Sequence, residues 1–275
     1  MYLDTEHFEV RLAESDAEIE AAQRLRYAVF VEELGAAGPL VDHDARLERD
    51  RFDPHVDHLL LFDLRRPAAN RVVGAYRLMR AAQAAAGDGF YAQSEFDLSP
   101  ILVSRRRVLE LGRSCLHANY RGGAGLLHLW SGLAGYVARH RIEILFGVAS
   151  FQGTDPQSIA APLSLLHHRH RAPASLCPRA LEPGRQRMDL LEPDSYDPSA
   201  AMRAVPALIK AYLRLGGLVG PEAWLDRPFN CIDVCLVLDT AAMPDKQRAL
   251  YDSRAKAQPH AAIATHTANH TDVSR

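Results

Sequence analysis

The sequence contains little cysteine, no long apolar run and almost no net charge, and each of these absences excludes a class of protein. The four cysteines among 275 residues show no zinc-ribbon spacing, so we expect small buried side chains in a reducing compartment. No segment approaches the roughly 18 apolar residues that a membrane span needs. The net charge of −2 argues against binding to nucleic acid, which favours a basic excess.

Several familiar motifs are missing as well. The N-terminus has neither the basic start nor the apolar core of a secretory signal, so we expect a cytoplasmic protein. There is no P-loop and no Gly-x-Ser-x-Gly turn. His167, His168 and His170 lie close together, but adjacent helical residues point in different directions. Because no matching cysteine or glutamate pattern accompanies them, no metal site is predicted.

Hydrophobic periodicity predicts a mixed α+β architecture. We expect strands at 8–13, 58–63, 71–79, 108–117, 142–148 and 233–239, and helices at 16–33, 126–140, 159–170 and 204–215. These elements do not alternate strictly, which favours a mixed sheet over a parallel one. The polar segment 35–54 reads as a mobile loop. We expect one domain over residues 1–252 and a disordered polar tail over 253–275.

A glycine-rich turn precedes the helix expected at 126–140. It consists of Arg121, Gly122, Gly123, Ala124 and Gly125. Glycines let the backbone approach a ligand closely, and the free N–H groups at the start of a helix bind anions. A phosphate group would suit such a turn, with Arg121 adding positive charge. A plain strand-to-helix connection is an equally good interpretation of the turn alone.

The strand expected at 108–117 carries an acid and a base within an apolar run. Residues three apart on a regular strand point to opposite faces. A bulge at Gly112 would bring Glu110 and Arg113 to one face and would splay this strand from its neighbour. The splay would admit an acyl-pantetheine arm and free backbone N–H groups for a thioester oxygen. The alternative, a surface ion pair, does not fit the apolar flanks.

Three arginines occur in apolar surroundings, and two aspartates offer counter-charges. Arg26 shares the apolar face of the first helix, Arg77 lies on a predicted strand, and Arg113 lies on the strand described above. Asp50 and Asp53 belong to the polar segment. Together the arginines predict a pocket for a zwitterionic or anionic substrate. A separate basic cluster, Arg105, Arg106 and Arg107, either docks an acidic partner or is a solvated surface.

Taken together, these residues resemble the acyl-carrier-protein-dependent branch of the GNAT-like acyltransferases, whose fold acyl-homoserine-lactone synthases share. That pattern contains an Arg-x-x-x-Phe helix, an Asp-x-x-Asp pair, a strand arginine and a Glu-x-x-Arg strand. The sequence matches it in order with Arg26, Phe30, Asp50, Asp53, Arg77, Glu110 and Arg113.

A closer resemblance, over roughly residues 8–251, is to the L-ornithine Nα-acyltransferases. It is carried by the stretches 110–121, 147–154 and 209–216 and by residues 226–234. Two departures occur in predicted strands: Cys231 and Ile232 stand where the resemblance leads us to expect threonines, and Val148 replaces an expected cysteine.

The resemblance implies a GNAT-like fold with a splayed central sheet and a specific reaction. A 3-hydroxyacyl group would pass from acyl-carrier protein to the α-amine of L-ornithine, which forms lyso-ornithine lipid, the first step of ornithine lipid biosynthesis. No cofactor would be bound, because the carrier protein supplies 4'-phosphopantetheine. That arm would lie over Arg121, Gly122, Gly123, Ala124 and Gly125, with Leu111 and Gly112 beside the acyl group.

The resemblance also implies roles for the remaining residues. Glu110 would remove a proton from the amine, directly or through a water, because only a neutral amine attacks. Arg113, Arg77 and Arg26 would hold the substrate carboxylate or order the active-site face, and charge suggests that Asp50 and Asp53 bind the side-chain amine. Phe30, Ser150 and Phe151 would complete the substrate site, and Arg105, Arg106 and Arg107 would dock the acidic carrier protein.

Other functions remain open at this stage. An acyl-homoserine-lactone-type synthase, or an N-acyltransferase for another amino acid, would share the arginines, aspartates and Glu-x-x-Arg strand. A non-catalytic protein that binds acyl-carrier protein or lipid would keep the fold without turnover. Because the expected product is a membrane-lipid precursor, peripheral contact with the inner face of the membrane is expected.

Overall fold

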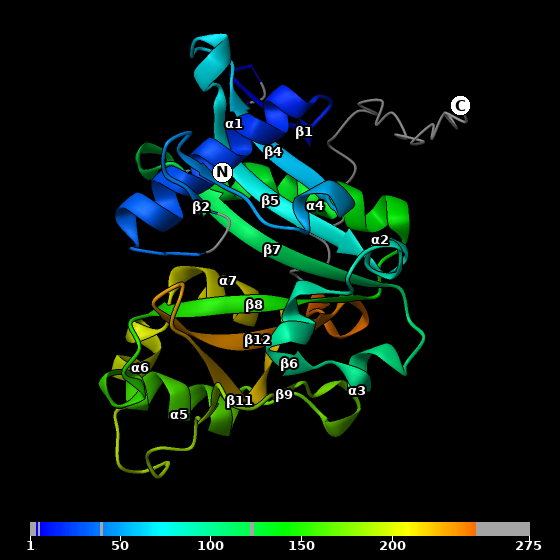
Figure 1. Cartoon of the computed structure of the whole chain (residues 1–275). Helices are drawn as coiled ribbons and strands as arrows, with labels where there is room; N and C mark the ends of the chain where they lie inside the picture. Colours follow the sequence, from blue (N-terminus) through cyan, green and yellow to red (C-terminus); the bar gives the residue numbers. More distant parts are fainter. Residues whose placement is uncertain (1–3, 5, 39–40, 122–123, 246–275) are drawn as a thin grey trace, which may run out of the picture.

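The structure is a computed structural model that describes residue 4 and residues 6–38, 41–121 and 124–245. Its centre is one eight-stranded sheet in the order β1-β4-β5-β7-β8-β12-β11-β10. All neighbouring strands are antiparallel except β7 and β8, which run parallel, so the predicted mixed sheet is confirmed (Figure 1). The expected domain limit at residue 252 and the tail at 253–275 lie outside the described residues.

All six predicted strands are present in this sheet, and its two further strands, β10 and β11, were not predicted. Along the sheet they are β1 (Phe8–Leu12), β4 (Asp57–Asp63), β5 (Val72–Arg80), β7 (Val108–Leu116), β8 (Ile144–Gln152), β12 (Cys231–Asp239), β11 (Leu218–Asp226) and β10 (Arg185–Arg187). Two short pairs lie outside it, β2 (Val41–Asp42) with β3 (Leu47–Glu48) and β6 (Phe96–Asp97) with β9 (Arg179–Ala180).

Helices cover both faces of the sheet. They are α1 (Asp16–Arg26), α2 (Ala81–Ala86), α3 (Ser99–Leu102), α4 (Gly125–His140), α5 (Ala160–Arg169), α6 (Pro198–Ala204) and α7 (Ala207–Arg214). The side chain of Ser15 caps α1 by accepting a hydrogen bond from the backbone N–H of Glu18. Helix α1 packs against one face through Leu25, near Ala75. Helix α4 packs against the other face, where Leu129 meets the neighbouring β5 residue Tyr76.

Three local expectations are corrected by the structure. The helix expected at 16–33 changes after Arg26 into a π-helix, η1 (Tyr27–Glu33). The segment 35–54 is not a simple loop, since it forms the β2–β3 hairpin and buries Glu48 and Asp53. Strand β11 was missed because Pro221 interrupts it; there the pairing with β12 shifts register. Within the described residues, no helix combines the length and apolarity of a membrane span.

Candidate active site

Strands β7 and β8 part in the middle of the sheet. Their pairing ends after Glu110, which lies opposite Phe146, although both strands continue for six residues beyond these two. At the parting point the backbones touch so closely that a Cβ atom on Gly147 would lie 2.2 Å from the carbonyl oxygen of Leu111. Only glycine fits there, and the two strands then diverge. The predicted splay of the central sheet is therefore present.

A β-bulge in β7 places Glu110 and Arg113 on the same face. The register with β5 passes from Gly112 opposite Arg77 to Cys115 opposite Ala75, so one β7 residue is extra. The sequence predicted the bulge at Gly112, but the left-handed residue is Arg113, with φ of 49°. The bulge lies one residue further along than expected. Its consequence is the one that was predicted, because Tyr91 contacts both side chains.

Glu110 is buried and held by backbone donors. Its Oε2 accepts a hydrogen bond from the N–H of Tyr91 at 2.9 Å, and its Oε1 accepts one from Ala92 at 2.7 Å. Both donors belong to the short helix η4 (Tyr91–Ser94). Burial raises the pKa of Glu110 to about 7, although the two N–H groups and the nearby Arg77 and Arg113 oppose the rise. A carboxylate with this pKa is suited to accept a proton near neutral pH.

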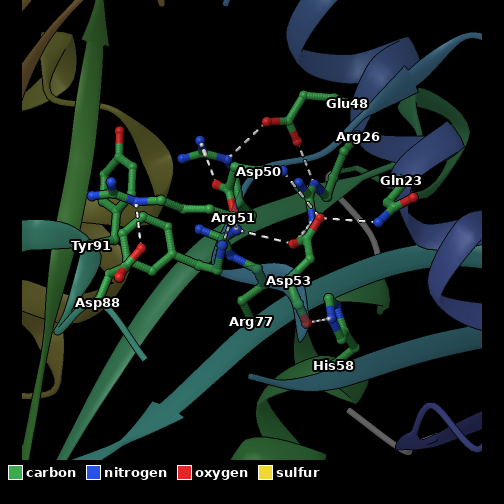
Figure 2. Close-up of polar contacts among 12 residues, drawn as sticks. Gln23, Arg26, Glu48, Asp50, Arg51, Asp53, His58, Arg77, Asp88 and Tyr91 are labelled. Carbon is green, nitrogen blue, oxygen red and sulfur yellow. Dashed lines mark hydrogen bonds and ion pairs between the residues drawn. The ribbon is translucent and has the colours of Figure 1, made fainter. Parts of the chain in front are cut away.

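Beside Glu110 lies a buried group that we call the ion-pair network. It consists of three arginines and three carboxylates, Arg26, Arg77, Arg113, Glu48, Asp50 and Asp53 (Figure 2). The arginines come from α1, β5 and β7, whereas all three carboxylates come from the segment that the sequence suggested was a loop. The three positive charges match the three negative ones.

The network's contacts are short and mutual. Nη1 of Arg26 donates to Oδ1 of Asp53 at 2.6 Å, and Nε of Arg26 donates to Glu48. Nη1 of Arg77 lies 2.5 Å from Oδ1 of Asp50 and 3.1 Å from Oδ1 of Asp53. Arg113 donates to Glu48 at 3.1 Å and to Asp50 at 3.2 Å. Sequence reasoning missed Glu48, whose only signal was its position near Asp50.

Asp50 and Asp53 are thus already paired with arginines. Burial alone would raise the pKa of Asp53, but Arg26 and Arg77 outweigh it and keep the pKa well below its usual range. Arg26, Asp50 and Asp53 are absent from the cavity wall described below. The expected contact between the two aspartates and a substrate amine stays a prediction, and the folded chain shows both carboxylates already bonded to the protein.

A cavity of about 270 Å³ occupies the opening between β7 and β8. Phe30 of η1 and Tyr212 of α7, which pack on opposite faces of the sheet, both line it, so the cavity passes through the sheet. Its apolar end is formed by Leu145, Leu208, Tyr212, Leu236 and Leu238, and its polar end by Arg77, Glu110, Arg113, Ser150, Asp226 and Asp233. Such a channel suits an acyl chain on one side and a polar acceptor on the other.

Two carboxylates of the polar end belong to the stretch 226–234 that carries the family resemblance, but no role in the site was predicted for them from the sequence. Asp226 ends β11 and Asp233 lies on β12; their exposed fractions are 5% and 2%. Glu95, 2% exposed, lies close enough that the charges of both aspartates add to the rise of its pKa, which burial begins. We call Glu95, Asp226 and Asp233 the acidic cluster. Asp233 follows two buried strand residues, Cys231 and Ile232, so local spacing did not predict a role in the site for it.

The other predicted residues fall in several places. Ser150, Leu111 and Gly112 all line the cavity; Ser150 is exposed and Leu111 is buried. Phe151 is 2% exposed and belongs to the core. The Nη1 of Arg121 lies 2.7 Å from Glu33. Ala124 and Gly125 begin α4, and Gly122 and Gly123 lie outside the described residues.

The basic cluster before β7 is only partly free. Arg106 makes two hydrogen bonds to Asp239, at 2.6 and 2.7 Å, and Arg107 pairs with Glu143 at 3.6 Å. Arg105 is exposed, and its side chain has no ion-pair partner among the residues that the structure describes. It follows Val103, which is 75% exposed, the most exposed large apolar side chain described.

Two histidines of the cluster at 167–170 bond to the protein. A ring nitrogen of His167 lies 3.0 Å from the carbonyl oxygen of Pro221, and one of His168 lies 3.0 Å from that of Leu191. These contacts tie α5 to the neighbouring backbone. They give the two rings a structural role.

Comparison with known proteins agrees with this geometry. Residues 25–131 match the acetyltransferase (GNAT) domain family. The chain is 57% identical over 249 residues to an L-ornithine N(alpha)-acyltransferase of Rhodobacter capsulatus, covering 90% of this chain and 95% of that protein. It is 41% identical over 251 residues to the L-ornithine N(alpha)-acyltransferase of Brucella abortus, covering 90% and 89%.

Among solved structures, a CoA-dependent acyl-homoserine lactone synthase with SAM and isopentyl-CoA is similar with a TM-score of 0.49 and 15% identity. It covers 91% of this chain and 89% of that one. The identities to the two acyltransferases are counted over 90% of this chain. The chain therefore belongs to the L-ornithine N(alpha)-acyltransferase family and is an N-acyltransferase with a GNAT fold.

Proposed function

We propose that the chain transfers a 3-hydroxyacyl group from acyl-carrier protein to the α-amine of L-ornithine, forming lyso-ornithine lipid in the first step of ornithine lipid biosynthesis. The acceptor follows the names of relatives that match over 90% of the chain. The observation that carries the proposal is the cavity through the sheet, which has Glu110 at its polar end and leucines at its apolar end.

Glu110 is the proposed general base. The attacking α-amine must lose its proton, and a buried carboxylate with a pKa of about 7 is ionised in a large fraction of molecules at neutral pH. The amine nitrogen forms the new bond to the thioester carbon while the bond from carbon to sulfur breaks. One proton of the substrate ammonium passes to Glu110, directly or through a water, before the attack. The second proton that the nitrogen loses as the amide forms passes to the departing thiolate, so the donor leaves as a thiol.

Arg77 and Arg113 are proposed to hold the substrate carboxylate. Both line the cavity beside Glu110, and each guanidinium is fixed by two carboxylates of the ion-pair network. A planar guanidinium that is held in this way binds a carboxylate with little loss of side-chain entropy. Arg26, which lies behind them and is 1% exposed, would position the carboxylates rather than touch the substrate.

The donor is proposed to be an acyl-carrier protein, whose 4'-phosphopantetheine would lie over the turn from Arg121 to Gly125. Support comes from the start of α4, where backbone N–H groups favour an anion, and from the exposed Arg105 beside Val103. An acidic carrier protein would be attracted by Arg105 and would cover the apolar Val103. A lipid product also supports peripheral contact with the inner face of a membrane.

The test is acyl transfer by the purified protein. It would be incubated with 3-hydroxyacyl-carrier protein or the matching acyl-CoA and with a panel of amino acids, while free thiol and product mass are followed. Ornithine-dependent thiol release with an amide product is expected, and only with the carrier protein as donor. Release with a different amino acid, or equal rates with acyl-CoA, would overturn the acceptor or the donor respectively.

A further inference from the structure

Two members of the acidic cluster, Asp226 and Asp233, line the cavity, and the proposed chemistry leaves them unused. Asp226 and Asp233 line the polar end, and each is at least nine-tenths buried. No arginine, lysine or histidine nitrogen among the described residues forms an ion pair with either carboxylate. Arg113 acts on both from a longer distance, but its own hydrogen bonds go to Glu48 and Asp50.

Partners within the protein satisfy these carboxylates only in part. Oδ1 of Asp226 accepts a hydrogen bond from the N–H of Phe229 at 3.0 Å, and no described donor reaches its second oxygen. Asp233 accepts a hydrogen bond from the thiol of Cys231 at 3.3 Å and another from the hydroxyl of Ser150. Oε2 of Glu95 is buried without any hydrogen-bond partner. Unpartnered buried carboxyl oxygens are costly, and a cation in the cavity would relieve that cost.

The pKa values of the cluster are raised in the direction that a bound cation would reverse. Burial raises the pKa of Asp233 to about 6, with Asp226 adding to the rise against the hydrogen bonds from Ser150 and Cys231. Burial also raises the pKa of Asp226, and it raises that of Glu95 well above the usual range. A bound ammonium group would lower all three by favouring the charged forms.

Register separates this cluster from the point of reaction. Glu110 lies opposite Phe146 of β8, and Asp233 lies opposite Ser150, four residues further along the same strand. Four residues of a strand span about 13 Å, so the side chains of Glu110 and Asp233, which both line the cavity, must cover part of the distance to a molecule that contacts both. An amino acid with a long side chain that ends in a cation could react at Glu110 and pair with a carboxylate beyond it, whereas one with a short side chain could not.

We propose that Asp226 and Asp233, with Glu95 nearby, bind the side-chain ammonium group of the amino-acid substrate and so select a basic acceptor over a neutral one. This inference rests on the proposed function, because it names the specificity determinant of the same site. It assigns the ammonium group to the acidic cluster instead of Asp50 and Asp53, whose charges Arg26, Arg77 and Arg113 already balance.

The experiment compares L-ornithine with L-norvaline, which has the same chain without the side-chain amine. Steady-state kcat/KM for both would be measured on wild-type protein and on the Asp226→Asn, Asp233→Asn and double variants. The ratio of ornithine to norvaline should fall on the order of ten- to a hundredfold in the double variant, through a higher KM for ornithine. Norvaline turnover should be kept, since the amine, Glu110 and the arginines are unchanged.

Asp63→Asn is the matched control. Asp63 is also buried, 3% exposed, but it bonds to Arg65 and Tyr120 away from the cavity. Its selectivity should equal that of the wild type. Circular dichroism and thermal melting would confirm folding, and at pH 8 the asparagine variants of the cluster should melt no lower than the wild type. If the double variant does not fold, the two single variants carry the same comparison.

Three results would overturn the inference. The first is an unchanged ratio in folded Asp226→Asn and Asp233→Asn proteins, and the second is an equal fall in Asp63→Asn. The third is loss of wild-type activity with a chelator and its recovery with a divalent metal, because Asp226, Cys231 and Asp233 could hold a metal ion instead. If the wild type acylates no amine at all, the proposed function itself fails, which is a distinguishable result.

Discussion

Acidic side chains are buried on two sides of the cavity, but on only one side are they paired with arginines. On the side of α1, β5 and β7, three carboxylates meet three arginines, and the pKa values of Glu48, Asp50 and Asp53 are lowered despite burial. On the side of β11 and β12, Asp226 and Asp233 meet no cation within ion-pair distance among the described residues, and their pKa values are raised.

This difference separates carboxylates that stabilise the fold from carboxylates that are available to bind a ligand. A buried carboxylate that is paired within the protein holds the protein together, because removing its partner leaves an uncompensated charge. A buried carboxylate without such a partner reduces stability until a ligand supplies the charge. Glu110 lies between the two sides. It accepts only backbone hydrogen bonds and has a raised pKa, so it resembles Asp226 and Asp233 rather than the paired carboxylates.

Removing an arginine from the ion-pair network should have the largest effect on stability. Replacing Arg26 with methionine keeps an apolar chain of similar length but removes one of the two arginines that pair with each of Glu48 and Asp53, and it leaves the network one positive charge short. We expect a loss of about 3–5 kcal/mol in the free energy of unfolding, measured by urea titration at neutral pH. The difference from the wild type should shrink as the pH falls below about 4, because the carboxylates of the unfolded chain take up protons there while those of the folded wild type, whose pKa values are lowered, stay charged.

The matched change for this prediction is Arg24→Ala. Arg24 is two residues away on α1, but its pair with Glu20 is about half exposed. Such a pair contributes little, and the loss should stay below about 1 kcal/mol. Equal losses in Arg24→Ala and Arg26→Met would contradict the view that burial and pairing give the network its importance.

Replacing Glu110 with glutamine should abolish most of the chemistry without unfolding the protein. General bases contribute roughly 10²- to 10⁴-fold, so kcat should fall by about that amount. The wild-type rate should rise with pH and level off above an inflection near 7, because the carboxylate is protonated and inactive below its pKa. A glutamine variant that keeps the inflection would show that another group, such as Asp233, is the base.

Adding a methyl group at Gly147, where β7 and β8 part, should have an intermediate effect. In Gly147→Ala the new methyl group meets the carbonyl oxygen of Leu111 at 2.2 Å, so a backbone must move. We expect a loss of roughly 1–3 kcal/mol in unfolding free energy and a higher KM for the acyl donor. Gly38→Ala is the control, since its nearest contact would be 3.9 Å away in the side chain of Val41. Normal donor affinity in Gly147→Ala would argue against an acyl group between β7 and β8.

The smallest effect is expected at the surface. Reversing the charge in Arg105→Glu should raise KM for the carrier protein several-fold and weaken its dependence on salt, because rim charges act mainly on the association rate. The control is Arg203→Glu, whose side chain is 73% exposed on α6, away from α3 and the segment after it (Figure 1). If both variants behave alike, the carrier protein does not dock at Arg105.

Patterns that depend on local sequence were predicted well. The strand expected at 108–117 is Val108–Leu116, and the helix expected at 159–170 is Ala160–Arg169, because each has an apolar run with clear ends. The Glu-x-x-Arg strand and its bulge were also anticipated. Strand β11 was not, since a proline within a strand pattern is an argument against a strand unless a register shift accommodates it.

Residues whose importance comes from distant neighbours were harder to find. Glu48 looks like a loop residue until the hairpin folds over β7 and brings it to Arg113, 65 positions away. Asp226 and Asp233 become adjacent only when β11 pairs with β12, and the absence of a cation beside them is a property of the packed structure. Spacing in a single sequence carries no information about such an absence.

The cavity that passes through the sheet sets a condition on product release. An acyl chain bound along it would lie between β7 and β8 and would have to leave the apolar end as the amide product departs. Each methylene that leaves the apolar end for water costs about 0.8 kcal/mol, so two methylenes slow the exit about tenfold. The rate of product release would therefore decrease as the acyl chain becomes longer. A bilayer that receives the emerging chain removes this cost, and it would accelerate turnover most for the longest acyl groups.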